Sequence, residues 1–375
     1  MRRATSTLGD YFINRRERGA EGLPLLSVTL RDGLVPRNTI ERRFESELED
    51  HDHLAVGKGD IAYNMMRMWQ GASGLAPYDA AVSPAYVVLQ PTKEIDPTFA
   101  SYWFKSERMI YLFWAYSYGL TEDRLRLYYK DFAAIPAAPP ALADQRKIAS
   151  VLAGCDQAIA ATDALVAVKQ QARRALMQRL MSGITQKAEL LNFARLRRSA
   201  QKGTGSSIEL ENIESGTGRL LGTTPLAAGA GNRFRFGAGD TLFGRLRPYL
   251  DKRIFADSPG LCSTEIWVLT PDERVCRPRY LYALTQTPEF KAAANVQSGS
   301  KMPRAEWGVV SEAPLPLPSL SEQDRISEAL ADADHELEVL ASQAAALRRQ
   351  KTALMQRLLP NEWFIGNSGA RAAAE

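Results

Sequence analysis

Basic and aromatic residues occur together at two places in each half of this 375-residue chain. The first place holds Arg67 beside Trp69 and, in the second half, Arg245 and Arg247 beside Tyr249. The planar fork of arginine donates two parallel hydrogen bonds, which suits phosphate oxygens and the edge of guanine. We therefore predict contacts with DNA here. The alternative is that each residue is an ordinary solvated surface arginine.

The second place follows Gly119 in the first half and Gly299 in the second, and is predicted to be a loop. It contains Arg124, Arg126, Tyr128, Tyr129 and Lys130 in the first half, and Lys301, Arg304 and Trp307 in the second. The full set of predicted DNA-contacting residues is Arg67, Arg124, Arg126, Lys130, Arg245, Arg247, Lys301 and Arg304.

A magnesium-dependent nuclease is the sharpest catalytic alternative. Asp272 after Pro271, followed by Glu289 and Lys291, matches a Pro-Asp…Glu-x-Lys pattern in which two acids hold the metal. Such a site needs the Glu-x-Lys on a strand, whereas here it follows a helix-like stretch at residues 278–285. The chain also lacks an Asn-Pro-Pro-Tyr methylation motif and a phosphate-binding G-x-x-x-x-G-K-[ST] loop. We predict no catalytic residues.

Cysteine and histidine usage predicts no metal site and no cofactor. The three cysteines lack CxxC spacing and the three histidines do not complete a ligand set, so a reducing compartment is expected. The N-terminus has no apolar stretch of a leader, and no segment approaches the roughly 18 apolar residues of a membrane span. We expect a cytoplasmic protein without a membrane partner. A net charge of +4 permits a nucleic-acid partner without requiring one.

The elements that position these residues occur twice. Residues 57–61 (GKGDI) recur 180 residues later as 237–241 (GAGDT), with Arg67 on Arg247 and Arg124 on Arg304. Further on, residues 176–180 (LMQRL) recur identically at 354–358, an offset of 178. The chain is therefore an internal two-fold repeat, which fixes its architecture.

Each half ends in a long helix with a heptad stripe that follows a proline-rich stop at residues 136–140 or 314–318. Each stripe spans about 50 Å at 1.5 Å per residue. Thr162, Lys169, Arg173 and Lys351 interrupt it. The predicted apolar seam consists of Ile148, Leu152, Ile159, Leu176 and Leu180 in the first helix, and of Ile326, Leu330, Leu337, Leu340, Leu347, Leu354 and Leu358 in the second.

Before each helix, strand-like runs alternate with helix-like stretches, which predicts α+β heads. The runs are residues 84–89 and 264–269, and the stretches are residues 97–106 and 278–285. Two long striped helices in one chain favour an antiparallel or parallel pair. A heptad stripe alone fits equally a coiled-coil hairpin for homodimerisation, but two similar heads suit a ligand with repeating units, such as duplex DNA.

The order of these features resembles the specificity subunits of type I restriction-modification systems over essentially the whole chain. The resemblance is carried by residues 8–10 (LGD), 24–29 (PLLSVT), 299–301 (GSK), 314–318 (PLPLP), Glu322-Gln323 with Ile326, and both LMQRL copies. It implies two target recognition domains, residues 1–140 and 190–318, separated by antiparallel spacer helices, residues 141–183 and 319–360. Residues 361–375 form a tail outside the pattern.

The resemblance also implies function and partners. Each recognition domain would bind one half of a bipartite double-stranded DNA target, and the helices would set the spacer and bridge two modification (methyltransferase) subunits. S-adenosylmethionine, ATP and magnesium would belong to those subunits and to restriction subunits. The remaining alternative is a coiled-coil scaffold that does not bind DNA, which would lack the steep salt dependence that phosphate contacts produce.

Overall fold

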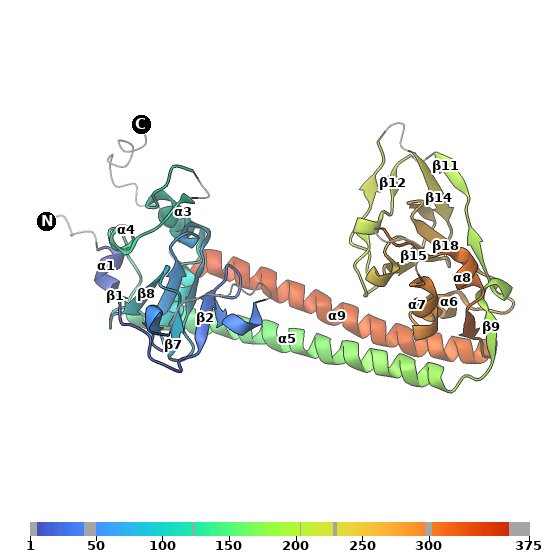
Figure 1. The fold of residues 1–375 in the computed structure, drawn as a ribbon, viewed down its shortest axis with the longest axis horizontal. Coiled ribbons are helices and arrows are strands. Elements are labelled where there is room, and N and C mark those ends of the chain that lie inside the picture. Colours follow the sequence, from blue (N-terminus) through green and yellow to red (C-terminus); the bar gives the residue numbers. More distant parts are fainter. Residues whose placement is uncertain are drawn as a thin grey trace. The chain divides into compact units, whose positions relative to one another are not determined.

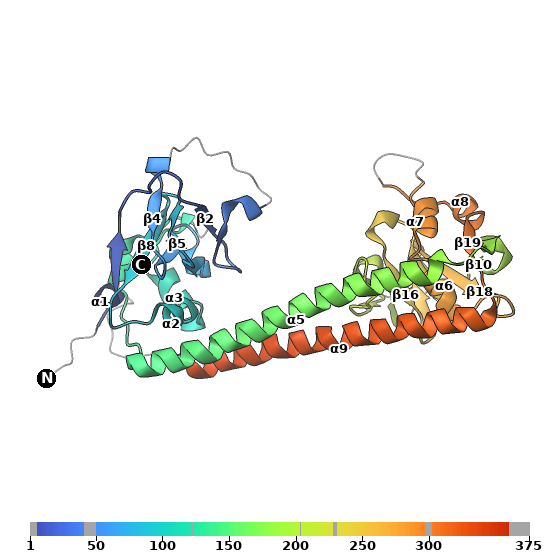
Figure 2. The same ribbon diagram turned by 90° about the horizontal axis from the view of Figure 1, so that it is seen from below.

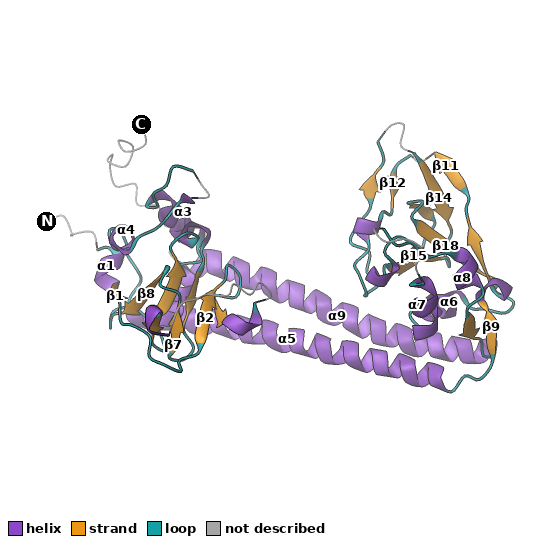
Figure 3. Ribbon diagram, viewed as in Figure 1, coloured by secondary structure: helices purple, strands orange, loops and turns teal. Residues whose placement is uncertain are grey.

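The computed structural model describes residues 6–40, 50–121, 124–202, 204–227, 231–296 and 302–359. The chain divides into two compact units, residues 1–163 with 343–375, and residues 164–342. Each unit has a head of mixed helices and strands together with part of two long helices, α5 (Leu142–Ser182) and α9 (Leu320–Leu358) (Figures 1 and 3). The predicted α+β class with two similar heads and two long helices is confirmed.

The described part of the first head is built on two four-stranded sheets, ordered β1-β8-β5-β6 and β3-β2-β7-β4. Their pairings are antiparallel except for β2 with β7. The strands are β1 (Phe12–Arg15), β2 (Leu25–Val28), β3 (Leu34–Pro36), β4 (Leu54–Val56), β5 (Ile61–Asn64), β6 (Ser73–Leu75), β7 (Ala80–Val82) and β8 (Tyr86–Pro91). The helices are α1 (Leu8–Tyr11), α2 (Pro97–Trp103), α3 (Glu107–Ala115) and α4 (Tyr129–Ala133), with 3₁₀ turns η1 (Arg37–Thr39), η2 (Asp50–Asp52) and η3 (Met68–Gln70).

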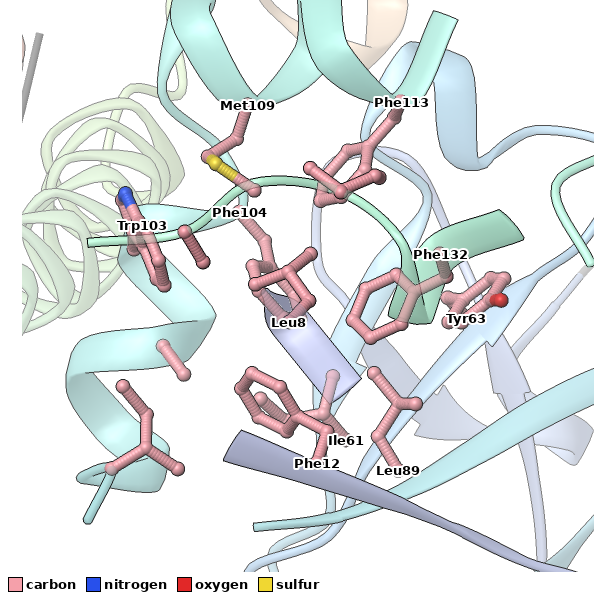
Figure 4. Close-up of a cluster of buried hydrophobic side chains, with 14 of the residues drawn as sticks. Leu8, Phe12, Ile61, Tyr63, Leu89, Trp103, Phe104, Met109, Phe113 and Phe132 are labelled. Atoms are coloured by element: carbon pink, nitrogen blue, oxygen red, sulfur yellow. The ribbon is translucent and has the colours of Figure 1, made fainter. Parts of the chain in front are cut away.

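An aromatic core joins the helices of this head to its first sheet (Figure 4). The Phe132 ring lies between Tyr63 of β5 and Phe113 of α3, with ring centroids 5.6 and 6.1 Å away. The Tyr63 hydroxyl donates to the Leu127 carbonyl at 3.2 Å, so the buried polar atom has a partner. The same bond fixes the backbone that leads into α4.

The second head repeats the first sheet in the order β10-β18-β15-β16 and adds, among the described residues, smaller sheets ordered β11-β14-β17, β12-β13 and β19-β9. The strands are β9 (Lys187–Glu189), β10 (Ala194–Arg197), β11 (Ala200–Lys202), β12 (Ser206–Ser207), β13 (Thr224–Pro225), β14 (Asn232–Phe236), β15 (Thr241–Gly244), β16 (Arg253–Phe255), β17 (Gly260–Cys262), β18 (Ile266–Pro271) and β19 (Pro314–Pro316). The helices are α6 (Pro278–Leu284), α7 (Pro288–Ala294) and α8 (Trp307–Ser311), with turns η5 (Leu190–Asn192), η6 (Leu210–Asn212) and η7 (Pro248–Leu250).

The repeat extends to single hydrogen bonds. The Asp60 carboxylate accepts the Gly57 N–H at 2.8 Å, and Asp240 accepts the Gly237 N–H at 2.6 Å. In both turns the intervening glycine is left-handed; Gly59 has φ of 90°. A residue with a Cβ would be strained there, so both copies carry glycine.

The two long helices run antiparallel within each unit, and Figures 1 and 2 show them side by side. Four ion pairs connect the two helices. From each pair to the next along α5, the partner on α9 has a lower residue number, as antiparallel helices require. In the first unit these are Asp156–Lys351 and Asp163–Arg348, each 2.5 Å, and in the second Lys169–Glu336 at 2.6 Å and Arg173–Asp334 at 2.7 Å. Three of the four residues predicted as interruptions, Lys169, Arg173 and Lys351, are therefore interhelical contacts, whereas the Thr162 hydroxyl donates to the Ala158 carbonyl of its own helix.

None of the predicted seam residues is fully exposed, and several pack against the cores of the heads. Leu152, Ile326 and Leu330 are buried. The half-buried ones are Ile148, Ile159, Leu176, Leu180, Leu337, Leu340, Leu347, Leu354 and Leu358. The observed helices end within two residues of the predicted spacer bounds.

One sequence expectation about α5 is wrong. This helix contains an 18-residue window that is long and apolar enough to cross a membrane by length and composition. A count of large apolar residues does not reveal this window, because many of its residues are alanines. Asp156 and Asp163 of α5 pair with cations of α9, and such carboxylates are costly in a bilayer. We interpret α5 as a coiled-coil helix.

A buried glutamine ties the first turn of each long helix to its head. The Gln145 side chain donates to the carbonyls of Glu94 (3.1 Å) and Pro140 (2.9 Å) and accepts the Asp96 N–H (2.8 Å). The Gln323 side chain makes the same three bonds with Val275 (3.0 Å), Pro318 (2.9 Å) and the Arg277 N–H (2.8 Å). Both glutamines come from the matched part of the repeat, and the structure gives the reason for the match.

We predict that Gln323→Met destabilises the second unit by about 2 kcal/mol, because it leaves one N–H and two carbonyls without their partner. The thermal midpoint, followed by circular dichroism, should fall by about 4–8 °C for a unit of this size. Gln178→Met, an exposed glutamine of α5, is the matched control and should leave the midpoint unchanged. Equal midpoints for the two variants would contradict a stabilising role of the Gln323 hydrogen bonds.

Candidate nucleic-acid interface

Two segments far apart in the sequence meet at the candidate interface of each head. In the second head the Arg247 N–H donates to the Pro303 carbonyl and the Ala305 N–H to the Arg245 carbonyl, both at 2.8 Å. In the first head the Leu127 N–H donates to the Met65 carbonyl at 2.9 Å. The structure thus brings together predicted residues from both places in each half.

These bonds correct one detail of the repeat. The bond from Leu127 to Met65 corresponds to that from Ala305 to Arg245, which makes Arg126, and not Arg124, the counterpart of Arg304. The alignment of Arg124 on Arg304 is wrong because the two-residue offset change falls before this segment and not after it.

The first head presents a basic depression of about 710 Å³. Lys130 lines it, together with Arg16 and Arg18, which follow β1 and were missed by the sequence analysis. The signal for them was the run Arg-Arg-Glu-Arg at residues 15–18. The remaining lining includes Asn14, His51, Asp52, His53, Leu54, Met65, Pro84, Tyr86, Val87, Tyr128 and Tyr129. Cations beside tyrosine rings suit a nucleic-acid backbone and its bases.

The other predicted residues of this head are exposed. Arg67 precedes η3, and Arg124 and Arg126 lie on the segment that leads to α4. The backbone of Arg126 forms an isolated antiparallel β-bridge with the backbone of Tyr118. Lys130 lies in the first turn of α4 and not in a loop as predicted, because Tyr128 already caps that helix.

The second head has a different arrangement at the same place. Glu265 accepts two hydrogen bonds from the Arg304 guanidinium, at 3.0 Å from both Nε and Nη2, and lies 3.9 Å from Arg245. The hydrogen bonds to Glu265 raise the pKa of Arg304. The repeat aligns Ala85 with Glu265, so this carboxylate is special to the second head.

Arg247 and Tyr249 lie on the same loop as Arg245. Both are exposed, and Tyr249 has 57% of its surface accessible. Arg247 is left-handed with φ of 51°, which is uncommon for a residue with a side chain. Lys301, also predicted as a DNA contact, lies outside the described residues.

The residues of the nuclease pattern are engaged elsewhere. Arg274 binds Asp272 at 2.6 Å, and Lys291 binds Asp251 at 2.7 Å. In the part of the chain that the structure describes, no three His, Cys, Asp or Glu side chains gather to hold a metal ion. Burial raises the pKa of the Cys262 and Cys276 thiols to about 12, so neither is a reactive thiolate.

Part of the second half of the chain matches a known protein family. Residues 246–347, which contain Arg247, Glu265 and Arg304, match the family described as the type I restriction modification DNA specificity domain. A curated relative, the EcoDI specificity subunit of an Escherichia coli type I restriction enzyme, is 31% identical over 118 residues. This match spans 31% of the present chain and 26% of that subunit.

Solved structures extend the likeness in fold beyond the matched specificity domain. The S subunit of a type I restriction-modification system from M. genitalium aligns with a TM-score of 0.56 and 16% identity, over 95% of this chain and 96% of that one. A chain from a structural study of complex assembly and conformational transition of a type I system aligns with the same TM-score at 15% identity, over 95% and 97%. At these identities the likeness shows a shared fold, which agrees with the resemblance seen in the sequence.

The charge arrangement around Glu265 gives a testable prediction. Glu265→Gln removes the carboxylate from Arg304 and Arg245 and leaves both free to bind polyanions, so the chain should elute from heparin at higher salt. Asp272→Asn is the matched control, since it frees Arg274 at the other end of β18, about 20 Å away. Equal shifts for both variants would mean that only net charge matters and that Glu265 does not lie in the anion-binding surface.

Proposed function

We propose that this chain is the DNA-specificity subunit of a type I restriction-modification complex and has no catalytic activity of its own. Each head binds one half of a bipartite target, and α5 with α9 sets the spacer between the halves. The observation that carries the proposal is the match of residues 246–347 to the specificity domain. The first head has the same order of strands in its sheet, the same glycine–aspartate turn and the same hydrogen bonds from a buried glutamine.

The two heads would bind different half-sites. The first offers Lys130, Arg16 and Arg18 around a depression, whereas the second offers Arg247 and Tyr249 beside a carboxylate shared by two arginines. Phosphate contacts hold the register on the duplex, and base contacts supply the specificity. An arginine–glutamate pair can also discriminate, because arginine binds guanine and a carboxylate accepts from cytosine N4.

Catalysis belongs to partner subunits in this proposal. Two modification (methyltransferase) subunits dock on the helices, and restriction subunits join complexes that also cleave DNA. S-adenosylmethionine, ATP and magnesium are bound by those subunits. The complex is placed in the cytoplasm, where its DNA substrate is, without a membrane partner.

Co-expression with candidate adenine methyltransferase subunits, followed by single-molecule sequencing of host DNA, tests the proposal. We expect one split motif with methylated adenines and a fixed gap, which identifies both half-sites at once. Unmodified DNA together with the absence of a co-purifying methyltransferase subunit would contradict the proposal and favour the scaffold.

Single alanine substitutions in each head should then weaken binding separately. Lys130→Ala and Arg247→Ala are each expected to raise the Kd for the full target about 10-fold, and to lower the slope of log K against log salt by about 1 where the lost contact is to phosphate. The two effects should add because the residues lie in different units. Arg274→Ala, an exposed arginine already paired with Asp272, should leave the Kd unchanged. An equal loss in all three variants would indicate a non-specific charge effect.

A further inference from the structure

The loop formed by residues 245–251 carries the exposed Arg247 and Tyr249 and has two unusual backbone conformations. Arg247 and Asp251 are both left-handed, each with φ of 51°, and neither is a glycine. Such residues keep this conformation only where surrounding contacts hold them. The contacts around Asp251 therefore decide how the exposed part of the loop is presented.

Asp251 is held by two cations. Its carboxylate lies 2.5 Å from Nη1 of Arg253 and 2.7 Å from Nζ of Lys291. The Asp251 carbonyl accepts the Gly216 N–H at 3.1 Å. Arg253 has only 4% of its surface exposed, so the end of the loop is fixed by a charge taken out of water. Breaking such a buried pair leaves an uncompensated charge, which makes the anchor stiff.

A single amide oxygen connects this anchor to the long helices. Oε1 of Gln286 accepts from Nη2 of Arg253 at 3.2 Å and from Nη1 of Arg173 at 2.7 Å. Arg173, on α5, also makes two bonds to Asp334 of α9, at 2.7 and 2.9 Å. Gln286 is itself 8% exposed. A continuous chain of polar contacts thus runs within the second unit from the loop to both helices.

The first head achieves the same result with different residues. Its loop ends at Gly71, which is left-handed with φ of 83°, and the Lys105 amine donates to the Gly71 carbonyl. Lys105 and Gln286 occupy equivalent positions, each just before the residue that caps the next helix. Partial burial of this amine lowers the pKa of Lys105 to about 8.

The helix end of the chain of contacts is also repeated. Asp156 and Lys351 stand 178 residues from Asp334 and Arg173, so the two ion pairs are the same pair of the repeat. In the first head the Tyr102 hydroxyl donates to Asp156 at 2.6 Å. An anchored loop beside a head-to-helix contact has therefore been built twice from different side chains, which indicates a shared requirement.

We propose that Arg253 and Gln286 are positioning residues that hold the 245–251 loop for recognition of the second half-site, and that Arg173 links them to the helices. This inference rests on the proposed function in one respect only, that the loop contacts DNA. Neither residue is proposed to touch a base. Each acts through Asp251 on the side chains of Arg247 and Tyr249.

Gln286→Met, made in the full chain, tests the proposal because methionine fills the space and accepts no strong hydrogen bond. The first measurement is hydrogen exchange without DNA. We expect the amides of residues 245–251 to exchange at least 10-fold faster, with no change in residues 65–71. Lys105→Met is the matched variant and should show the reverse pattern. Arg173→Met should give the same direction of change as Gln286→Met in the second loop.

The second measurement is competition binding of the complex with modification subunits, using targets with single base changes in either half-site. Gln286→Met should reduce discrimination at the second half-site about 10-fold and leave the first unchanged. Unchanged loop exchange, or equal losses at both half-sites, would overturn the inference. A wild-type complex that discriminates no sequence would instead overturn the proposed function, while the exchange data would still report whether Gln286 holds the loop.

Discussion

The junction between each head and its long helix is the constraint on which the rest of the structure depends. The proline carbonyl before each long helix and the backbone of the loop that follows β8 or β18 both need hydrogen-bond partners. One glutamine side chain in the first turn supplies these partners. Gln145 or Gln323 donates to the proline carbonyl and to a carbonyl of the loop, and accepts an N–H of the same loop. Because a glutamine carries no charge, this junction avoids the desolvation cost of an ion pair.

A fixed junction allows the exposed surface to differ between heads. The buried turn at Asp60 and Asp240 and the register of the central strands are the same in both copies. At the interface the repeat instead places Lys130 on Gly308 and Ala85 on Glu265. Changes confined to such positions alter charge without disturbing the core, so one fold carries two surfaces of different charge.

The sequence predicted what is periodic or repeated and missed what depends on partners in space. The heptad stripe indicated both long helices and gave their C-terminal ends to within two residues, whereas the helices begin six residues before the stripe does. The same stripe made Lys169 and Arg173 look like defects, because their partners Glu336 and Asp334 lie more than 160 residues away in the chain. Arg16 and Arg18 were missed because a run of charges is ordinary on a surface until a concave wall is known to surround it.

Glu265 shows why counting arginines alone misjudges such an interface. Its carboxylate already satisfies Arg304 and approaches Arg245, so a phosphate that binds either guanidinium must displace a charge-assisted pair. Under the proposed function, that competition would weaken attachment to arbitrary DNA more than attachment to a site whose bases replace both the lost donor and the lost acceptor. Specificity is the difference between the affinities for target and non-target DNA. A residue that lowers the affinity for non-target DNA therefore increases specificity as well as a residue that raises the affinity for the target.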